Sequence, residues 1–253
     1  MSRATTIHID LSVISDNIAA LRAPLSNQKL LAVLKANAYG HGAVPVAQHI
    51  EAMVDALAVA YTEEAVILRD AGIKAPILVL EGPHDASDLA LIAKLDLWPV
   101  LHQEEQLQWC KAQAAHLPHV WIKLDTGMHR LGFAPDQIGP VRQQLLEMGI
   151  ASVTAMSHLA SAEDPDSPLT QAQLASWSHH TGFLDAPTSL HNSAATRSSL
   201  PARSDWMRVG YALYGGQVQG LAADPKIKAA MELRSAGLAV PQVKSGESVG
   251  HGG

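Results

Sequence analysis

The sequence predicts an α/β protein built on a (β/α)8 TIM-type barrel, and three observations lead to this fold class. Short apolar runs alternate with helical patterns about eight times along the 253 residues, which is the pattern of a parallel barrel. Only 4% of the residues are aromatic while 47% are hydrophobic, which suits helices packed on parallel strands better than a β-sandwich. The length allows one large α/β domain or two small ones. An open doubly wound sheet is the alternative.

The first helix is expected in the segment DLSVISDNIAALRAPL, which begins at Asp10. Leu11, Ile14, Ile18 and Leu21 recur at helical spacing and therefore share one apolar face. Asp10 is a suitable N-cap, because its carboxylate can accept hydrogen bonds from the free N–H groups of the first helical turn.

Eight apolar runs are expected to form the barrel strands, with helical segments between most of them. One such helical segment, TEEAVILRDAG (62–72), ends on Gly72, a residue type that often terminates helices. The later strands are less regular than the first five. The expected strands are LLAVL (30–34), ALAVA (56–60), PILVL (76–80), WPVL (98–101), HVWIKL (119–124), SVTAMS (152–157), TSLH (188–191) and WMRVG (206–210).

The pattern changes near residue 230. The segment MELRSAGLAVPQVKSGESVGHGG contains no crossover helix and predicts a strand, a turn and a second strand: ELRSAGLAV, then Pro241 and KSGE. We therefore expect a barrel over residues 1–230 and an incomplete β-domain stub over residues 231–253.

Charge and cysteine content exclude several classes of function. A net charge of −6 argues against a nucleic-acid or anionic-membrane partner. The single cysteine, Cys110, excludes an internal disulfide framework and fits a reducing compartment. Residues 1–10 contain no apolar signal core, and no apolar run approaches membrane-spanning length. We expect a cytoplasmic protein.

Two histidine pairs and one glycine-containing string suggest ligand sites only superficially. His116/His119 and His179/His180 are not joined by cysteines or carboxylates at a ligand spacing, so we expect no metal site. The string DTGMHRLGF (125–133) lacks a phosphate-loop lysine, so it is weak evidence for nucleotide binding.

The ends of the predicted strands carry the candidate site residues, because barrels gather their chemistry at the carboxyl ends of the strands. In LLAVLKANAYGHG (30–42) an apolar run leads directly into Lys35, although lysine is seldom buried without a partner. The other strand ends add Lys123, Asp125 and Arg130; Ser157 and His158; His191, Asn192 and Ser193; and Arg208 and Gly210.

The last two barrel loops favour a phosphate. NSAAT (192–196) and GYALYG (210–215) are made of small residues that let backbone N–H groups approach an anion, and Ser193 adds a hydroxyl. An amine beside a phosphate pocket suggests a Schiff base with pyridoxal phosphate, for which Lys35 must lose its proton; burial near other cations favours that loss. An arginine such as Arg208 facing the pyridine nitrogen would keep that nitrogen unprotonated and disfavour transamination.

Five segments together resemble bacterial alanine racemases. They follow one another in the order of that family, and the resemblance runs from Leu11 to Gly253. They are AVLKANAYGHG (32–42), IKLDTGMHRLGF (122–133), MSHLA (156–160), HNSAAT (191–196) and MRVGYALYG (207–215). The resemblance implies interconversion of L- and D-alanine with pyridoxal 5′-phosphate, either for peptidoglycan synthesis or for alanine catabolism.

The resemblance also implies roles for individual residues. Lys35 would hold the cofactor and act as one of two catalytic bases. Arg208 would face the pyridine nitrogen, and His158 would lie against the ring and bond Arg208. Lys123 resembles the family's carbamylated lysine, which holds Arg130; that arginine helps to orient the substrate carboxylate and the second base. The remaining cofactor-binding residues would be Tyr39, Asn192, Ser193, Gly210 and Tyr211.

The chain departs from the family near its end. Members of the family carry a complete C-terminal β domain with a GYADGY-like segment, whose tyrosine is the opposite-face base and is supplied across a homodimer. None of Tyr39, Tyr61, Tyr211 and Tyr214 lies in such a segment. We therefore expect a truncated racemase that lacks the second base, with impaired turnover and a weakened dimer surface.

Simpler interpretations remain for single residues. Lys35 alone would more often be a lysine whose amine reaches water, and His158 a core histidine. Lys123 could be a buried ion-pair partner of Asp125 or of another nearby carboxylate. Two other functions also remain: a barrel that carries pyridoxal phosphate without turnover, and a fold-related amino-acid decarboxylase, which an arginine at the pyridine nitrogen would suit poorly.

Overall fold

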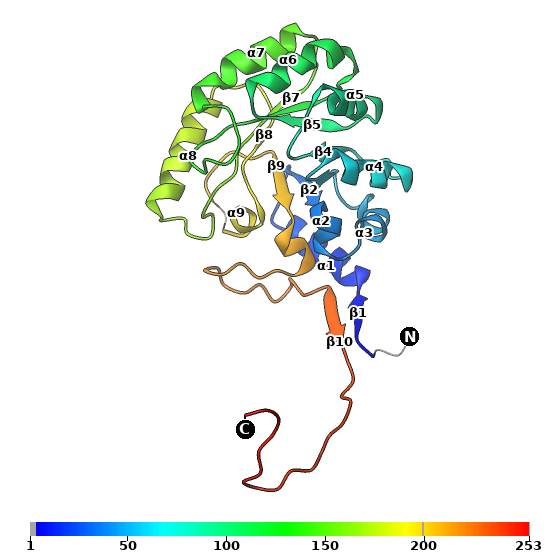
Figure 1. Ribbon diagram of the computed structural model, residues 1–253. Helices are drawn as coiled ribbons and strands as arrows, with labels where there is room; N and C mark the ends of the chain where they lie inside the picture. The colour runs from blue at the N-terminus through cyan, green and yellow to red at the C-terminus, as the bar shows by residue number, and fades with distance from the viewer. Residues whose placement is uncertain (1–3, 199, 253) are drawn as a thin grey trace.

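The computed structural model describes residues 4–198 and 200–252. Eight parallel strands form the barrel, and helices surround it (Figure 1). The strands are β2 (Lys29–Val33), β3 (Ala56–Val59), β4 (Ile77–Val79), β5 (Trp98–Leu101), β6 (Val120–Lys123), β7 (Val153–Met156), β8 (Thr188–Ser189) and β9 (Trp206–Val209), with β1 (Thr6–Ile9) and β10 (Met231–Arg234) outside the barrel. The helices are α1 (Leu11–Arg22), α2 (Lys35–Tyr39), α3 (Ala43–Ile50), α4 (Thr62–Asp70), α5 (Ala86–Lys94), α6 (Glu104–Gln113), α7 (Ile138–Glu147), α8 (Pro168–Thr181) and α9 (Ser193–Ser198), with 3₁₀ turns η1 (Ala114–His116), η2 (Pro135–Gln137) and η3 (Tyr211–Tyr214).

The strand order confirms the predicted barrel. Neighbouring strands follow the order β8-β7-β6-β5-β4-β3-β2-β9. Two backbone hydrogen bonds then join the outer strands, from Asp205 N to Thr188 O at 2.8 Å and from Arg208 N to His191 O at 2.9 Å. The sheet is therefore nearly closed, and the open doubly wound alternative is wrong.

Alternation along the strands decides which side chains enter the barrel. Leu31, Trp121 and Trp206 belong to the small apolar cluster inside the barrel, whereas the apolar residues next to them in the sequence belong to the larger cluster outside the strands. Successive strand residues point to opposite faces of a sheet. The residues two positions later, Lys123 on β6 and Arg208 on β9, are therefore directed inward at the carboxyl end of the barrel.

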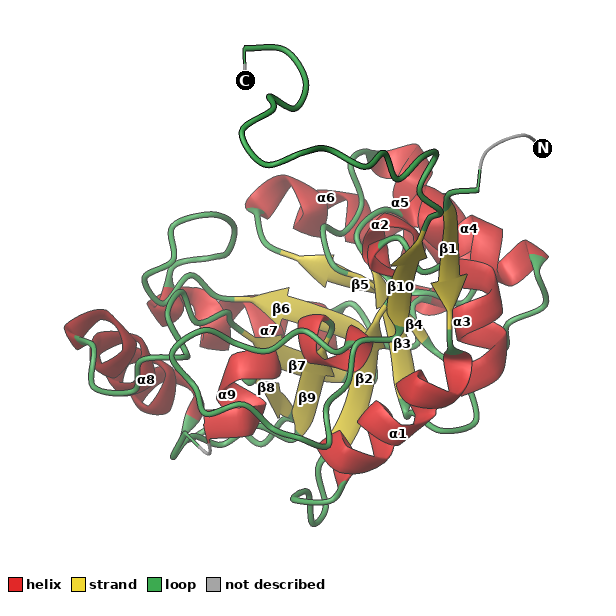
Figure 2. Ribbon diagram, turned by 90° about the horizontal axis from the view of Figure 1, so that it is seen from below, coloured by secondary structure: helices red, strands yellow, loops and turns green. Residues whose placement is uncertain are grey.

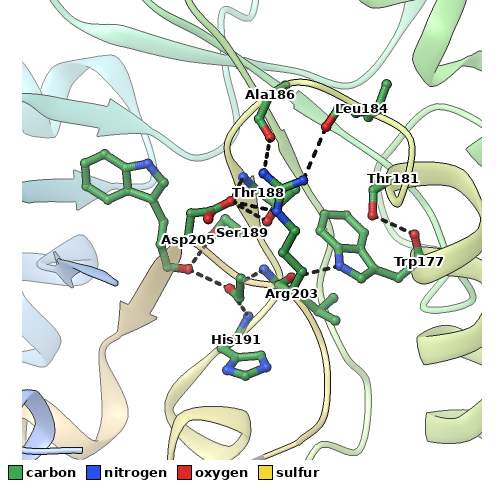
Figure 3. A network of polar contacts seen from close by, with 12 residues as sticks. Trp177, Thr181, Leu184, Ala186, Thr188, Ser189, His191, Arg203 and Asp205 are labelled. Atoms are coloured by element: carbon green, nitrogen blue, oxygen red, sulfur yellow. Dashed lines mark hydrogen bonds and ion pairs between the residues drawn. The ribbon is translucent and has the colours of Figure 1, made fainter. Parts of the chain in front are cut away.

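A polar network at the other end of the barrel ties β8 to the start of β9 (Figure 3). The guanidinium of Arg203 donates to Leu184 O at 3.2 Å and Ala186 O at 3.0 Å. It also pairs with the carboxylate of Asp205 at 3.4 Å. That carboxylate accepts from both the backbone N and the hydroxyl of Thr188 at 2.8 Å. This network fixes the strand that carries the site arginine.

The segment after residue 230 differs from its prediction. Only Met231–Arg234 forms a strand, and it pairs antiparallel with β1, which the sequence analysis did not predict (Figure 2). Between residues 235 and 252 the structure has no strand, so the expected strand–turn–strand unit is wrong. The first strand finds its partner near the start of the chain instead, and the side chains of 235–252 are exposed. The domain division at residue 230 stays a prediction.

No helix in residues 4–198 and 200–252 has the length and apolar character needed to span a bilayer.

Candidate active site

A cavity of about 610 Å³ lies at the carboxyl ends of the barrel strands. Ten residues named in the sequence analysis line it: Lys35, Tyr39, Lys123, Arg130, His158, Asn192, Ser193, Arg208, Gly210 and Tyr211. Asp125, Ser157 and His191, which also follow or end predicted strands, are not part of its lining. Four of these side chains are cationic, and the one carboxylate in the lining is that of Glu81. The cavity therefore suits an anionic ligand.

The segment after Lys35 is a left-handed turn. Ala36, Asn37, Ala38 and Tyr39 have φ angles of +54°, +54°, +56° and +53°. Side chains with a Cβ disfavour this conformation by roughly 1–2 kcal/mol per residue. Four such residues in succession therefore need other contacts to hold them, and such strain is typical of functional sites.

Hydrogen bonds from side chains and backbone hold this turn. The carboxylate of Glu64 accepts from Ala36 N at 2.6 Å. The amide oxygen of the Asn37 side chain accepts from Ala43 N at 2.8 Å, and the carbonyl of Asn37 accepts from Gly42 N at 3.0 Å. Lys35 and Tyr39, at the two ends of the turn, both reach the cavity.

Arg208 is buried at the centre of the site, and no carboxylate of residues 4–198 and 200–252 forms an ion pair with it. Its guanidinium donates to Ser189 O at 2.9 Å and to Ser157 O at 2.7 Å. Burial lowers the pKa of Arg208 to about 10, so the guanidinium stays charged at neutral pH. It also donates to His158 Nδ1 at 3.4 Å. Burial and then Arg208 lower the pKa of His158 to about 3, so this histidine is neutral and its Nδ1 can accept.

Lys123 is a buried amine, with 5% of its surface exposed. Burial, and then the charges of Arg208 and Arg130, lower its pKa to about 8. Among the described residues it forms no ion pair within 4.0 Å. The ion-pair interpretation is therefore wrong, because the Asp125 carboxylate turns to Gly127 N at 3.0 Å and to the backbone and ring of His129.

Small groups from three segments form a cradle for an anion. The hydroxyl of Ser193 accepts from Gly210 N at 3.2 Å and from Ala212 N at 3.3 Å. A Cβ on Gly210 would lie 2.6 Å from the Tyr39 hydroxyl. Burial raises the pKa of Tyr39, which keeps the phenol protonated as a donor. Two hydroxyls and two backbone N–H groups thus converge where a phosphate would fit.

The other predicted residues lie around this cradle. Arg130 and Tyr211 are exposed at the rim of the cavity. The side-chain oxygen of Asn192 accepts from Ala195 N at 3.0 Å, so Asn192 caps α9. Ser193 lines the cavity as well as starting that helix.

Sequence reasoning missed part of the site. Val33, Ala60, Leu80, Glu81, Leu131, Met156, Ala194 and Val218 also line the cavity. Most lie at or just after strand ends, so the strand-end rule could have found them, but all except Glu81 have apolar side chains that gave no chemical signal. Glu64 was missed as a partner of the lysine segment, although a glutamate in the first turn of a helix signals a cap.

No cluster of three or more potential metal ligands occurs in the part of the chain that the structure describes.

The chain matches known proteins over nearly its whole length. Residues 9–218 match the family model "Alanine racemase, N-terminal domain". An alanine racemase from Alteromonas mediterranea is 40% identical over 254 residues, covering 100% of this chain and 71% of the relative.

Solved structures agree with this match. A biosynthetic alanine racemase from Pseudomonas aeruginosa superimposes with a TM-score of 0.86 at 38% identity, covering 99% of this chain and 71% of that one. An alanine racemase from Bartonella henselae with covalently bound pyridoxal phosphate gives a TM-score of 0.81 at 25% identity, covering 93% and 70%.

Proposed function

Because the chain belongs to the alanine racemase family, we propose that it binds pyridoxal 5′-phosphate through Lys35 and moves the α-proton of alanine. One observation supports this above the others. The lysine segment, the buried arginine and the anion cradle, drawn from distant parts of the sequence, line the same cavity.

The residues of the cavity fit this cofactor. The hydroxyls of Ser193 and Tyr39 and the N–H groups of Gly210 and Ala212 would hold the phosphate, since both N–H groups point at the Ser193 hydroxyl and the Tyr39 hydroxyl lies beside Gly210. The absence of a Cβ on Gly210 leaves room for that convergence. When bound, pyridoxal phosphate supplies an aldehyde that links to amines and a ring that draws electron density from the α-carbon.

The protein would contribute positioning and proton transfer. Lys35 would take or return the α-proton, as a general base within reach of the substrate. Arg208, held by two backbone carbonyls, keeps its own proton and so offers a fixed donor. His158, which is neutral, would line the cavity as a flat acceptor for that arginine.

Lys123 and Arg130 would select the substrate. Both line the cavity, and the positively charged guanidinium of Arg130 could bind the carboxylate of an amino acid. The lowered pKa of Lys123 gives its amine more of the neutral form that reacts with carbon dioxide. We therefore infer that Lys123 is carbamylated and then orients Arg130.

The test is α-proton exchange in heavy water, measured by proton NMR on L- and D-alanine separately, with added pyridoxal phosphate. A base reaches the face of the α-carbon on which it lies. We expect Lys35 to exchange the proton of one enantiomer. Exchange of both enantiomers with racemisation would also support the proposal and would show that a second base acts on the opposite face.

The lysine assignment is tested by Lys35→Ala against a control, Lys74→Ala, whose side chain is exposed away from the cavity. Lys35→Ala should lower the exchange rate by at least about 100-fold, the scale of lost general-base catalysis. It should also remove the absorbance of lysine-bound cofactor. Cofactor binding without exchange in the parent chain would instead support a carrier protein, and an unchanged spectrum in Lys35→Ala would refute the assignment.

A further inference from the structure

One carboxylate, that of Glu64, connects the turn after Lys35 to the neighbouring barrel segment. Its Oε1 accepts from Ala36 N at 2.6 Å. Its Oε2 accepts from Ala60 N at 2.7 Å and from Tyr61 N at 3.3 Å. We propose that Glu64 is a positioning residue that fixes Lys35 by joining this turn to the segment between β3 and α4.

The position of the contact explains why it would act on the lysine. Ala36 directly follows Lys35, and the left-handed turn that begins there ends at Tyr39. Lys35 and Tyr39 both line the cavity. A change in the turn would therefore move the amine and the phenol together, and the hydrogen bond to Ala36 N is the contact that ties the start of the turn to another barrel segment.

The chemistry requires a carboxylate rather than an amide. Both oxygens of Glu64 accept hydrogen bonds from backbone N–H groups on two different segments. A glutamine side chain has one oxygen and one NH2 group. Its NH2 group would therefore face one of these backbone N–H groups, and two donors cannot form a hydrogen bond. Glu64→Gln therefore keeps the size of the side chain while removing one of the two connections.

A helix cap alone does not account for these contacts. Glu64 lies in the first turn of α4, where a carboxylate accepts from the preceding N–H groups. That role needs Ala60 and Tyr61 but not Ala36. Glu64→Asp keeps the negative charge in the first turn but is shorter by one methylene. It is expected to lose the connection to Ala36 and to keep α4 intact.

The first measurement is hydrogen exchange of the Ala36 amide, followed by NMR in the full chain without added cofactor. We expect exchange to be at least tenfold faster in Glu64→Gln and in Glu64→Asp. Glu63→Gln makes the same charge change in the same helical turn from an exposed side chain, and it should change the rate less than twofold. Unchanged protection of Ala36 in both Glu64 variants would overturn the proposal.

The second measurement is the dissociation constant of pyridoxal phosphate, read from the absorbance of the lysine-bound cofactor. What this dissociation constant says about catalysis rests on the proposed function. We expect about a tenfold increase in both Glu64 variants and less than a twofold change in Glu63→Gln. Faster Ala36 exchange with unchanged cofactor affinity would overturn the positioning role.

Two features keep these outcomes separate. If the parent chain does not bind pyridoxal phosphate, the proposed function fails while the exchange experiment still decides whether Glu64 holds the turn. If Glu64→Gln does not fold, Glu64→Asp decides the question, because it retains the charge at the start of α4.

Discussion

Gly210 has no side chain, and the hydroxyl of Tyr39 occupies the space beside it. A Cβ there would lie 2.6 Å from that hydroxyl, so Gly210→Ala must displace one of the two groups. The displaced phenol would leave the cradle formed with Ser193, and we expect the dissociation constant of pyridoxal phosphate to rise about tenfold, or about 1.4 kcal/mol. Isothermal titration calorimetry measures this change.

Gly139→Ala is the matched control for this substitution. Gly139 lies in α7, and a Cβ there would meet nothing within 4 Å. Cofactor affinity should stay unchanged, while the helix gains about 0.5–1 kcal/mol of stability from the loss of glycine. Equal affinities in the two alanine variants would contradict the role assigned to the cradle.

Residue type and strand position together made most of the site predictable. Lys35 and Ser193 come after apolar runs and Arg208 interrupts one, so each polar residue is conspicuous, and the family motifs supplied their roles. Glu64 could not be assigned in this way. A glutamate near a helix start predicts a cap, but its second partner, Ala36, belongs to a segment that only the closed barrel brings near.

At the scale of elements, Asn17 fastens α1 to the chain around η3. It is fully buried, and its side-chain amide donates to Leu213 O at 3.0 Å and to Lys228 O at 2.8 Å. It also accepts from Lys228 N at 2.9 Å. Asn17→Leu would leave these backbone groups without a partner, which costs on the order of 3 kcal/mol in the free energy of unfolding.

Urea denaturation at neutral pH measures that loss. The exposed residue Asn27 provides the control, since Asn27→Ala should change the free energy of unfolding by less than about 0.5 kcal/mol. The loss should be accompanied by weaker cofactor binding, because η3 begins at Tyr211, beside the phosphate cradle. A stability equal to that of the parent chain would show that α1 and η3 are held by apolar packing alone.

The elements were predictable to different extents. Each barrel strand was expected within a few residues of its place, because fully buried parallel strands are short apolar runs bounded by polar turns. The pairing of β1 with β10 was not predictable. Ile7 and Leu233 lie opposite each other and remain exposed, so neither strand has the buried pattern that marks a strand in a sequence.

At the scale of the whole molecule, three histidines that stay neutral in the fold link stability to pH. Burial is the main cause that lowers the pKa of His119 and His191 to about 4 and that of His158 to about 3. In the unfolded chain a histidine titrates near pH 6.5. Between about pH 6.5 and 4 the unfolded state therefore binds more protons than the folded state.

This difference sets the direction of the pH dependence. Stability rises with pH wherever the unfolded state binds more protons, so the histidine contribution is complete above about pH 6.5 and is lost as the pH falls toward 4. We expect each of these histidines to add up to roughly 1 kcal/mol per pH unit to this slope. Urea denaturation at a series of pH values gives the slope directly.

His191→Leu isolates one of these contributions. The His191 side chain is 6% exposed, its Nε2 has no hydrogen-bond partner among the residues the structure describes, and the nearby charge of Arg208 disfavours its protonation further. The leucine variant should lose roughly 1 kcal/mol per pH unit of the slope between pH 4 and 6.5. His116→Gln, at an exposed position, should leave the slope as it is.

Identical slopes in His191→Leu and the parent chain would mean that the folded state admits a proton at this position. The barrel would then be more open to water beside Arg208 than its packing implies, and the fixed charge assigned to that arginine would be better solvated.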